Sequence, residues 1–147
     1  MISDFRDVLA ALVANGVRFL IVGAHALAAH GVPRVTGDLD IWVEPTATNA
    51  SRIWRALSEF GAPMSALNIC ESDFSTLDQV VQIGLPPYRI DIMTSISGVD
   101  FAEAREEALS GTLFEVPVQF IGRQAFVRNK RASGRPKDLE DIRSLGG

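Results

Sequence analysis

Two aspartates, Asp38 and Asp40, lie two residues apart in the apolar stretch RVTGDLDIWVEP. Side chains at positions i and i+2 of a β-strand point to the same face, so the two carboxylates project together, with their Cα atoms about 7 Å apart. Like charges at this spacing raise each other's pKa and oppose folding unless a cation meets them. Mg²⁺ suits the pair, because it binds carboxylate oxygens and keeps water and phosphate as its other ligands. The alternative is a solvent-facing strand edge without function.

A glycine turn precedes this pair. The stretch FLIVGAHALAAHG, residues 19–31, predicts a strand, a turn at Gly23 and a short helix. A glycine at a strand-to-helix turn lets a phosphate approach the backbone, and the start of the helix offers free N–H groups. Gly23 is therefore a candidate phosphate-binding position, although taken singly it is explained by turn geometry alone.

A third aspartate follows on a later predicted strand. In YRIDIMTSI, residues 88–96, Asp91 alternates with Ile90 and Ile92 and so faces away from these apolar side chains. It could join the two upstream aspartates in a two-metal site, or it could form a surface ion pair with Arg89. The order along the chain favours the metal site: a glycine turn, then D-x-D on a strand, then a single aspartate on another strand.

The elements that position these residues are predicted from apolar periodicity and turn residues. Helices are expected over 5–13, 24–31, 48–61, 100–111, 123–133 and 137–145. Strands are expected over 17–23, 38–44, 76–84 and 89–96, with a β-hairpin or two short strands around Pro117 over 112–121. Because strands and helices alternate, we expect an α/β (α+β) fold with a mixed, twisted sheet flanked by helices, forming a single domain over 1–147.

Composition places the chain among ordinary globular proteins. Of its 147 residues, 47% are hydrophobic and 22% are charged, so disorder is not expected. Cys70 is the only cysteine, which excludes an internal disulfide and a thiolate metal cluster. The N-terminal stretch lacks the pattern of a signal peptide, and no apolar run approaches a membrane span. We therefore expect a cytoplasmic protein without membrane contact.

Charge is unevenly distributed along the chain. The net charge is -4, yet six of the 14 lysines and arginines lie between Arg123 and Lys137, a segment without an acidic residue. This pattern suggests a local anion-binding site or a solvated helix face, and it disfavours a strongly basic DNA-binding module. The sequence contains no P-loop, no G-x-G-x-x-G and no G-x-S-x-G, which argues against the corresponding nucleotide-binding and hydrolase sites.

With these residues in this order, the sequence resembles the nucleotidyltransferase superfamily that includes DNA polymerase beta. That family has a glycine turn after the first strand, D-x-D on the second strand and a lone aspartate on a later strand. The matching residues are Gly23 and Ala24, Asp38 and Asp40, and Asp91. Many members have a serine or a second glycine where this chain has Ala24, whose side chain cannot bind phosphate.

The sequence is also similar to small bacterial nucleotidyltransferase-like proteins of the AbiEii type, which belong to toxin–antitoxin and phage-defence systems. Those proteins carry an arginine and a threonine just before D-x-D, here Arg34 and Thr36. They also carry a late arginine-x-lysine-aspartate element, here Arg135, Lys137 and Asp138. Larger members add a helical domain that grips the base or the acceptor, and none is visible in this sequence. The choice of base and acceptor would then depend on a partner protein, or be weak.

The resemblance implies that a nucleoside monophosphate moves from a nucleoside triphosphate to an acceptor, with pyrophosphate leaving. The acceptor would be RNA, a protein or a small molecule. Two Mg²⁺ ions would be held by the three aspartates, and Asp91 could also take the proton from the attacking hydroxyl. The residues expected to neutralise the phosphates are Lys130, Arg135 and Lys137.

Several neighbouring residues have two interpretations each. Arg34 and Thr36 either reach a phosphate or brace the turn, and Arg34 could instead form a salt bridge to one of the three aspartates. Lys137 binds phosphate or simply belongs to an ordinary helix start. His25 could contact a phosphate from the turn. Trp42 walls the pocket or stacks on a base, or it is partly buried beneath a helix.

Two other functions fit the same residues. A non-catalytic descendant that binds a nucleotide or a partner protein is favoured by Ala24 and by the missing helical domain. The three retained carboxylates oppose that interpretation. A metal-dependent phosphohydrolase would use the same ligands with water as its acceptor, and nothing in the sequence separates it from a transferase.

Overall fold

The computed structural model describes residues 2–85 and 87–146. Its strands are β1 (Phe19–Val22), β2 (Asp38–Val43), β3 (Val80–Leu85), β4 (Tyr88–Met93), β5 (Leu109–Leu113) and β6 (Val116–Phe120). Its helices are α1 (Ile2–Ala14), α2 (Gly23–Ala29), α3 (Ala47–Phe60), the 3-10 helix η1 (Glu71–Ser75), α4 (Phe101–Glu106), α5 (Arg123–Ser133) and α6 (Pro136–Ser144). None of the helices in the described part of the chain is long and apolar enough to cross a bilayer.

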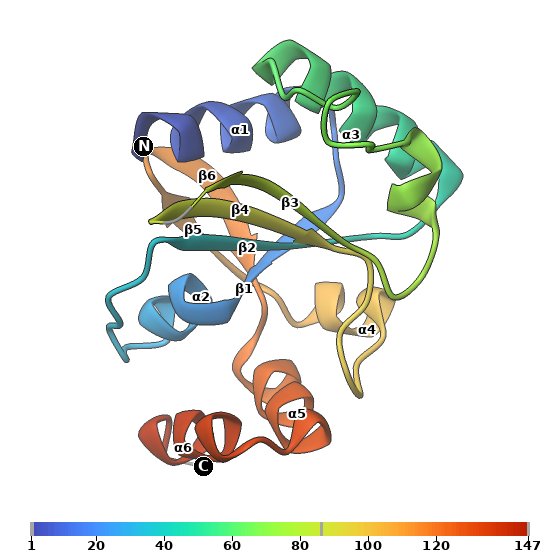
Figure 1. Cartoon of the computed structure of the whole chain (residues 1–147). Helices are drawn as coiled ribbons and strands as arrows, with labels where there is room; N and C mark the ends of the chain where they lie inside the picture. The colour runs from blue at the N-terminus through green and yellow to red at the C-terminus, as the bar shows by residue number, and fades with distance from the viewer. Residues whose placement is uncertain (1, 86, 147) are drawn as a thin grey trace.

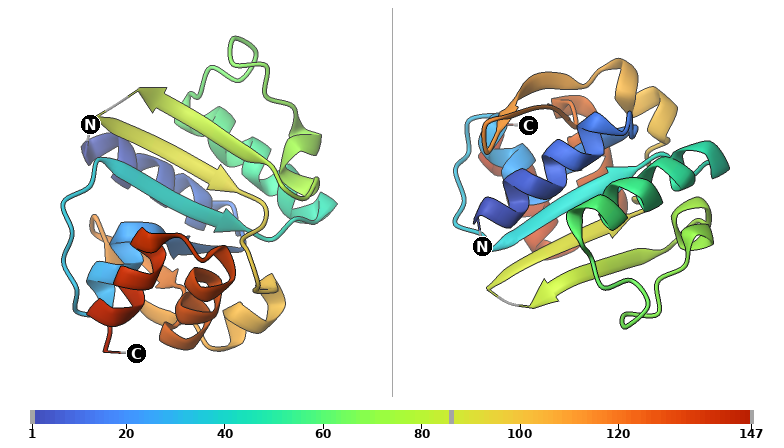
Figure 2. Two further views of the ribbon diagram at one scale, coloured as in Figure 1. Left: turned by 60° about the horizontal axis from the view of Figure 1, so that its bottom comes forward. Right: turned by 90° about the horizontal axis from the view of Figure 1, so that it is seen from above.

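The six strands form one mixed sheet in the order β3-β4-β2-β1-β6-β5 (Figure 1). At its centre, β1 runs antiparallel to β2 and parallel to β6, while β2 runs parallel to β4. The edge strands β3 and β5 pair antiparallel with β4 and β6. Helices α1 and α3 cover one face, and α2 and α4 lie on the other, with α5 and α6 beyond α2 (Figures 1 and 2). The predicted α/β class with a mixed sheet flanked by helices is confirmed.

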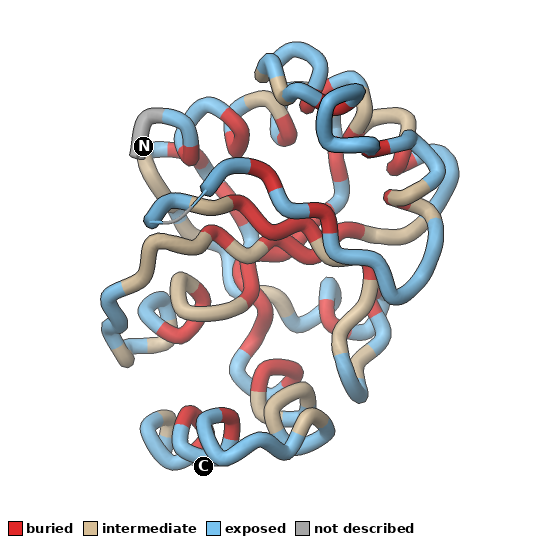
Figure 3. Tube along the Cα trace, in the orientation of Figure 1, coloured by how far each residue is buried: buried red, intermediate tan, exposed pale blue. Residues whose placement is uncertain are grey.

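The main hydrophobic core lies in the sheet and on the inner sides of α1 and α3 (Figure 3). Helix α1 turns Phe5, Leu9 and Leu12 inward, because positions i, i+4 and i+7 share one helical face. Helix α3 adds Ile53 and Leu57, and all five side chains are buried. With α1 and α3 packed on one face, the carboxylate-bearing positions of β2 lie on the face that α2 and α4 share.

Trp42 lies on the aspartate side of β2 but belongs to the core. Its side chain is buried, and its ring meets the edge of Phe101 in α4 at 5.0 Å between centroids. Trp42 therefore lies beneath a helix, as one of its interpretations predicted, and its burial is complete where partial burial was expected. His25 is half-buried at the start of α2, its ring stacked edge-on against Phe114, and burial lowers the pKa of its imidazole.

Several predicted boundaries are wrong. The strand expected over 76–84 begins at Val80, and the strand expected over 89–96 ends at Met93. The helix expected over 100–111 ends at Glu106, because the chain from Leu109 onward pairs with β6 as an edge strand. The hairpin turns at Phe114 and Glu115, whose φ angles of 48° and 70° are left-handed, and not at Pro117. Pro117 lies inside β6, opposite β5, where sheet pairing overrides the local turn signal.

Candidate active site

Adjacent parallel strands bring the three predicted aspartates together. In the register of β2 and β4, Asp38 lies opposite Arg89 and Asp40 lies opposite Asp91. Because side chains alternate along each strand, all four residues share one face of the sheet. The spacing of Asp38 and Asp40 made their common face predictable, whereas the position of Asp91 beside Asp40 follows from strand pairing.

Arg89 lies between two of the three carboxylates. Its Nε and Nη2 donate to the two oxygens of Asp91 at 2.8 and 3.1 Å, and Nη2 also lies 3.4 Å from Asp38 Oδ2. The three aspartates lie together as expected, and Asp91 also pairs with Arg89. This pair is largely buried, whereas the alternative placed it at the surface. Asp91 is only 8% exposed, and it does not line the pocket described below.

Asp40 is the carboxylate without a direct cationic partner. Among the described residues, no hydrogen bond or ion pair of its side chain is found. Burial raises the pKa of Asp40 to about 6, and the charges of Asp91 and Asp38 add to that rise, while Lys130 and Arg89 partly oppose it. The raised pKa indicates that nearby cations do not compensate the burial and negative surroundings of this carboxylate.

The absence of a side chain at Gly23 leaves space for the Asp40 carboxylate. This glycine has a φ of +70°, and a Cβ built on it would overlap the Oδ2 atom of Asp40. Only a residue without a side chain therefore leaves room for the carboxylate against the β1–α2 turn. The predicted phosphate turn and the predicted metal strand are in contact at this point.

A polar pocket of about 250 Å³ opens beside these residues. It is formed by the β1–α2 turn, the loop before β2, the start of β2 and the helices α5 and α6. All the predicted site residues except Asp91 line it: Gly23, Ala24, Arg34, Thr36, Asp38, Asp40, Lys130, Arg135 and Lys137. Leu27, Val35 and Asp141 complete the lining.

The basic residues of the pocket differ in how far they are neutralised. Arg34 Nη2 lies 2.6 Å from Asp141 Oδ1, so the alternative in which Arg34 pairs with one of the three strand aspartates is wrong. Arg135 donates from Nε to Asp138 Oδ2 at 2.8 Å. Within the part of the chain that the structure describes, Lys137 has no ion pair and is the basic residue most available to a ligand.

Thr36 and Lys130 have structural contacts as well. Thr36 Oγ1 accepts a hydrogen bond of 3.0 Å from the backbone N–H of Asp38, so it braces the start of β2, as one of its two interpretations predicted. Lys130 Nζ lies 3.4 Å from Asp138 Oδ1 and 4.0 Å from Asp141 Oδ2. Its charge also opposes the rise in the pKa of Asp40 that burial and the other aspartates cause.

Sequence reasoning missed the role of the two buried acids in α6. Asp138 is fully buried, and Asp141 is 4% exposed. They hold the cations Lys130, Arg135 and Arg34 at the pocket wall. The signal was present in RPKDLEDI, where two aspartates at i and i+3 share one helical face toward the basic segment.

Comparisons with known proteins give the fold its name. The sequence matches no protein-family model and no curated protein. Three solved structures each superpose with a TM-score of 0.60. ANT(2'')-Ia in complex with adenylyl-2''-tobramycin is 15% identical, and the match covers 98% of this chain and 86% of that one. The chain has the nucleotidyltransferase fold.

The other two structures agree with this assignment of the fold. TM1012 from Thermotoga maritima, assigned as a nucleotidyltransferase, is 16% identical over 97% of this chain and 88% of its own. The solution structure of the antibiotic-resistance factor ANT(2'')-Ia is 15% identical over 98% of this chain and 81% of its own. The described nucleotidyltransferase fold therefore extends over nearly the whole chain.

The side chains at the pocket suit a divalent ion in part. Asp38 and Asp40 offer carboxylate oxygens to the pocket, which is the ligand chemistry that Mg²⁺ prefers. Within residues 2–85 and 87–146, no three His, Cys, Asp or Glu side chains form a ready cluster, and Arg89 lies between Asp38 and Asp91. The donor set thus fits an ion at Asp38 and Asp40, with Asp91 available only when Arg89 moves.

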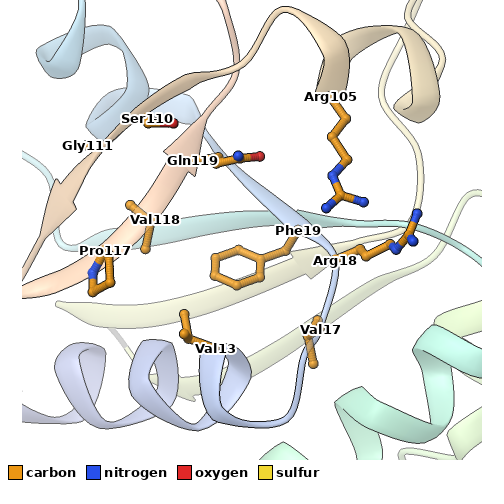
Figure 4. A pocket seen from close by; sticks show the side chains of 10 residues that line it. All are labelled: Val13, Val17, Arg18, Phe19, Arg105, Ser110, Gly111, Pro117, Val118 and Gln119. Carbon is orange, nitrogen blue, oxygen red and sulfur yellow. The ribbon is translucent and has the colours of Figure 1, made fainter.

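A larger cavity of about 340 Å³ lies at the other end of β1 (Figure 4). Phe19, Val118 and Pro117 form an apolar side, and Arg18 and Arg105 project from another (Figure 4). None of the predicted site residues lines it. Asp38 and Asp40 therefore open onto the smaller, polar pocket and not onto this cavity.

Proposed function

We propose that the chain is a Mg²⁺-dependent nucleotidyltransferase that moves a nucleoside monophosphate from a triphosphate to an acceptor. One observation carries the proposal: a single pocket joins the carboxylates Asp38 and Asp40 to Lys130 and Lys137 across the Gly23 turn. A nucleoside triphosphate needs both features, metal ligands on one side and cations for its phosphates on the other.

Each residue has a task in this proposal. Asp38 and Asp40 bind the divalent ion, which would neutralise developing charge on the phosphates when bound. Lys137, free of ion pairs among the described residues, and Lys130 meet the phosphate oxygens. Asp91 is the candidate base for the proton of the acceptor hydroxyl.

No residue of this chain identifies the acceptor. The structure of ANT(2'')-Ia is a complex with adenylyl-2''-tobramycin, so tobramycin is the first small-molecule acceptor to try alongside RNA and protein. A partner protein and a toxin–antitoxin or defence role rest on the AbiEii-type resemblance alone. The labelled-triphosphate assay described below therefore includes RNA and protein as acceptors.

A nucleotide-binding domain without turnover is the second candidate. It is favoured by Ala24, which offers no hydroxyl to a phosphate, and by the Arg89 guanidinium that covers Asp91. Such a domain would still bind a nucleotide with Mg²⁺ through Asp38 and Asp40. Binding and turnover must therefore be measured separately.

The test begins with calorimetric titration of the four nucleoside triphosphates in the presence of Mg²⁺. The wild type is compared with the Asp38→Asn/Asp40→Asn double variant and with Asp7→Asn, which removes an exposed acid of α1 on the opposite face of the sheet. Binding that depends on Mg²⁺ and is lost only in the double variant supports the site. No binding by a folded wild type at millimolar nucleotide contradicts the proposal.

Turnover is measured next with α-³²P-labelled triphosphates. Label on RNA, protein or tobramycin, with pyrophosphate released, supports the transferase. Labelled nucleoside monophosphate with pyrophosphate, or labelled diphosphate with free phosphate, and no labelled acceptor indicates a phosphohydrolase that uses water. Binding without either product favours the domain without turnover.

A further inference from the structure

We propose that Arg89 is a built-in counter-cation that competes with the divalent ion for Asp91 and Asp38. The proposal rests on the proposed metal site, and it gives a role to Arg89, which has no task in the nucleotide transfer proposed above. Arg89 contacts Asp91 through two nitrogens at 2.8 and 3.1 Å and reaches Asp38 at 3.4 Å. A guanidinium in this fork occupies the same carboxylate oxygens that a metal would need.

The exposure of the side chains shows which carboxylates Arg89 covers. The side chain of Asp91 is 11% exposed, that of Asp38 is 42% exposed, and that of Arg89 is 28% exposed. Asp38 and Asp40 line the pocket, and Asp91 does not. An ion that enters the pocket therefore meets Asp38 and Asp40 first, and it reaches Asp91 only when the guanidinium turns aside.

The backbone on both sides holds this arrangement in place. Arg89 donates its N–H to the carbonyl oxygen of Gly37 at 3.1 Å, directly before Asp38. A Cβ on Gly37 would overlap the carbonyl oxygen of Pro87, so the loop before β2 and the β3–β4 turn touch at this point. The backbone of Arg89 is thus fixed beside Asp38, and the guanidinium turns aside by rotation about its own side-chain bonds.

The charges explain why a counter-cation is useful here. Three carboxylates on one sheet face repel one another, and the metal-free chain has to fold with them side by side. Arg89 is always protonated and supplies one positive charge where two of them meet. A divalent ion supplies two and is favoured when it is present, so its affinity reflects the cost of displacing Arg89.

A purely structural role for Arg89 makes the opposite prediction. If Arg89 only held Asp91 in a shape that suits the metal, its removal would loosen the site and weaken metal binding. If it competes, its removal strengthens metal binding and weakens the metal-free fold. Affinity for the ion alone, without nucleotide or turnover, separates the two roles.

The experiment measures Mn²⁺ binding by electron paramagnetic resonance for the wild type, Arg89→Gln, Arg89→Lys and Arg128→Gln. The Arg128→Gln control removes the same charge from a pair with Glu107, outside the pocket. Thermal unfolding of all four proteins is recorded in EDTA and in Mn²⁺.

We expect Arg89→Gln to bind Mn²⁺ at least about tenfold more tightly, because one positive charge leaves the metal position. Its unfolding temperature should fall in EDTA and rise more with Mn²⁺ than that of the wild type. Arg89→Lys keeps the charge but loses the two-nitrogen contact with Asp91, so its Mn²⁺ affinity should lie between those of the wild type and Arg89→Gln. Arg128→Gln should stay close to the wild type.

Unchanged or weaker Mn²⁺ binding by folded Arg89→Gln overturns the proposal, as does tightening of equal size in Arg128→Gln. Should Arg89→Gln fail to fold even with Mn²⁺, Arg89→Lys decides, since Mn²⁺ binding no tighter than that of the wild type contradicts competition. Tighter Mn²⁺ binding without any nucleotide binding supports the role of Arg89 and counts against the proposed function alone.

Discussion

Arg34 and Asp141 are 107 residues apart in the sequence, and their side chains meet at 2.6 Å across the pocket. Arg34 comes from the loop before β2, and Asp141 comes from α6. The pair therefore fastens the C-terminal helix to the segment that leads into the proposed metal strand. Arg34 supports the wall of the pocket even before any role toward a nucleotide is considered.

We expect Arg34→Gln to lower the free energy of unfolding by about 1–3 kcal/mol, because it leaves the buried Asp141 without its nearest donor. In a double-mutant cycle with Asp141→Asn, measured by urea denaturation, the two changes should cost less together than the sum of the single costs. Additive costs would mean that the contact contributes nothing. The cycle also separates this structural role from any effect of Arg34 on nucleotide affinity.

Asp138 holds α5 and α6 together through an ionised carboxylate. It is fully buried and accepts hydrogen bonds from Ser133 at 2.7 Å and from Arg135 at 2.8 Å, with Lys130 at 3.4 Å. Burial alone would raise its pKa, but these donors and charges outweigh burial and hold the pKa below its ordinary value. A carboxyl with a lowered pKa in the fold stabilises the protein above its unfolded pKa and loses that contribution as pH falls.

Replacing Asp138 by Asn should therefore cost on the order of 2 kcal/mol of unfolding free energy at neutral pH. The difference from the wild type should shrink as pH falls below about 4, because the Asp138 carboxyl takes up its proton in the unfolded chain while the folded protein still keeps it ionised. Urea denaturation at pH 7 and pH 3 measures both values, with Asp7→Asn as an exposed control. A difference that does not change between these pH values would contradict the ionised role.

The sequence predicted what depends on local periodicity and missed what depends on distant pairing. The i, i+2 rule placed Asp38 and Asp40 on one face of a strand, and the glycine at position 23 marked the turn. Both follow from neighbours along the chain. The order of the strands, which sets Asp91 beside Asp40, is decided by long-range packing that no short stretch encodes.

The contacts of the basic residues show the same limit. The six basic residues from Arg123 to Lys137 suggested an anion site, yet Lys130 and Arg135 contact buried acids of the following helix. A charge count does not say whether a cation is neutralised by the protein itself. Likewise, Arg89 was visible as a partner for Asp91, but its reach to Asp38 depends on the strand register.

Asp40 should make the stability of the metal-free protein depend on pH. Burial, with the charges of Asp91 and Asp38, raises its pKa from 3.8 to about 6, so the folded state binds more protons than the unfolded state between these values. The free energy of unfolding should therefore fall as pH rises through this window, by about 2–3 kcal/mol in total.

Asp40→Asn removes this dependence. In EDTA, the variant should be more stable than the wild type at pH 8, and the advantage should disappear as pH falls to about 3, where the wild-type carboxyl is largely neutral in both states. Urea denaturation across this range, with Asp7→Asn as the control for net charge, measures the effect. An advantage of the same size at both ends of the range would show that packing, and not ionisation, is responsible.

Gly23 and Gly16 provide a matched test of the contact between the turn and Asp40. Their φ angles are +70° and +68°, so alanine meets the same backbone strain at both positions, about 1 kcal/mol. A Cβ at position 16 meets nothing within 4 Å, whereas one at position 23 overlaps the Asp40 carboxylate. We expect Gly23→Ala to cost clearly more stability than Gly16→Ala and to weaken Mn²⁺ binding, which Gly16→Ala should leave unchanged. Equal costs and equal affinities, measured by urea denaturation and electron paramagnetic resonance, would mean that the turn does not position Asp40.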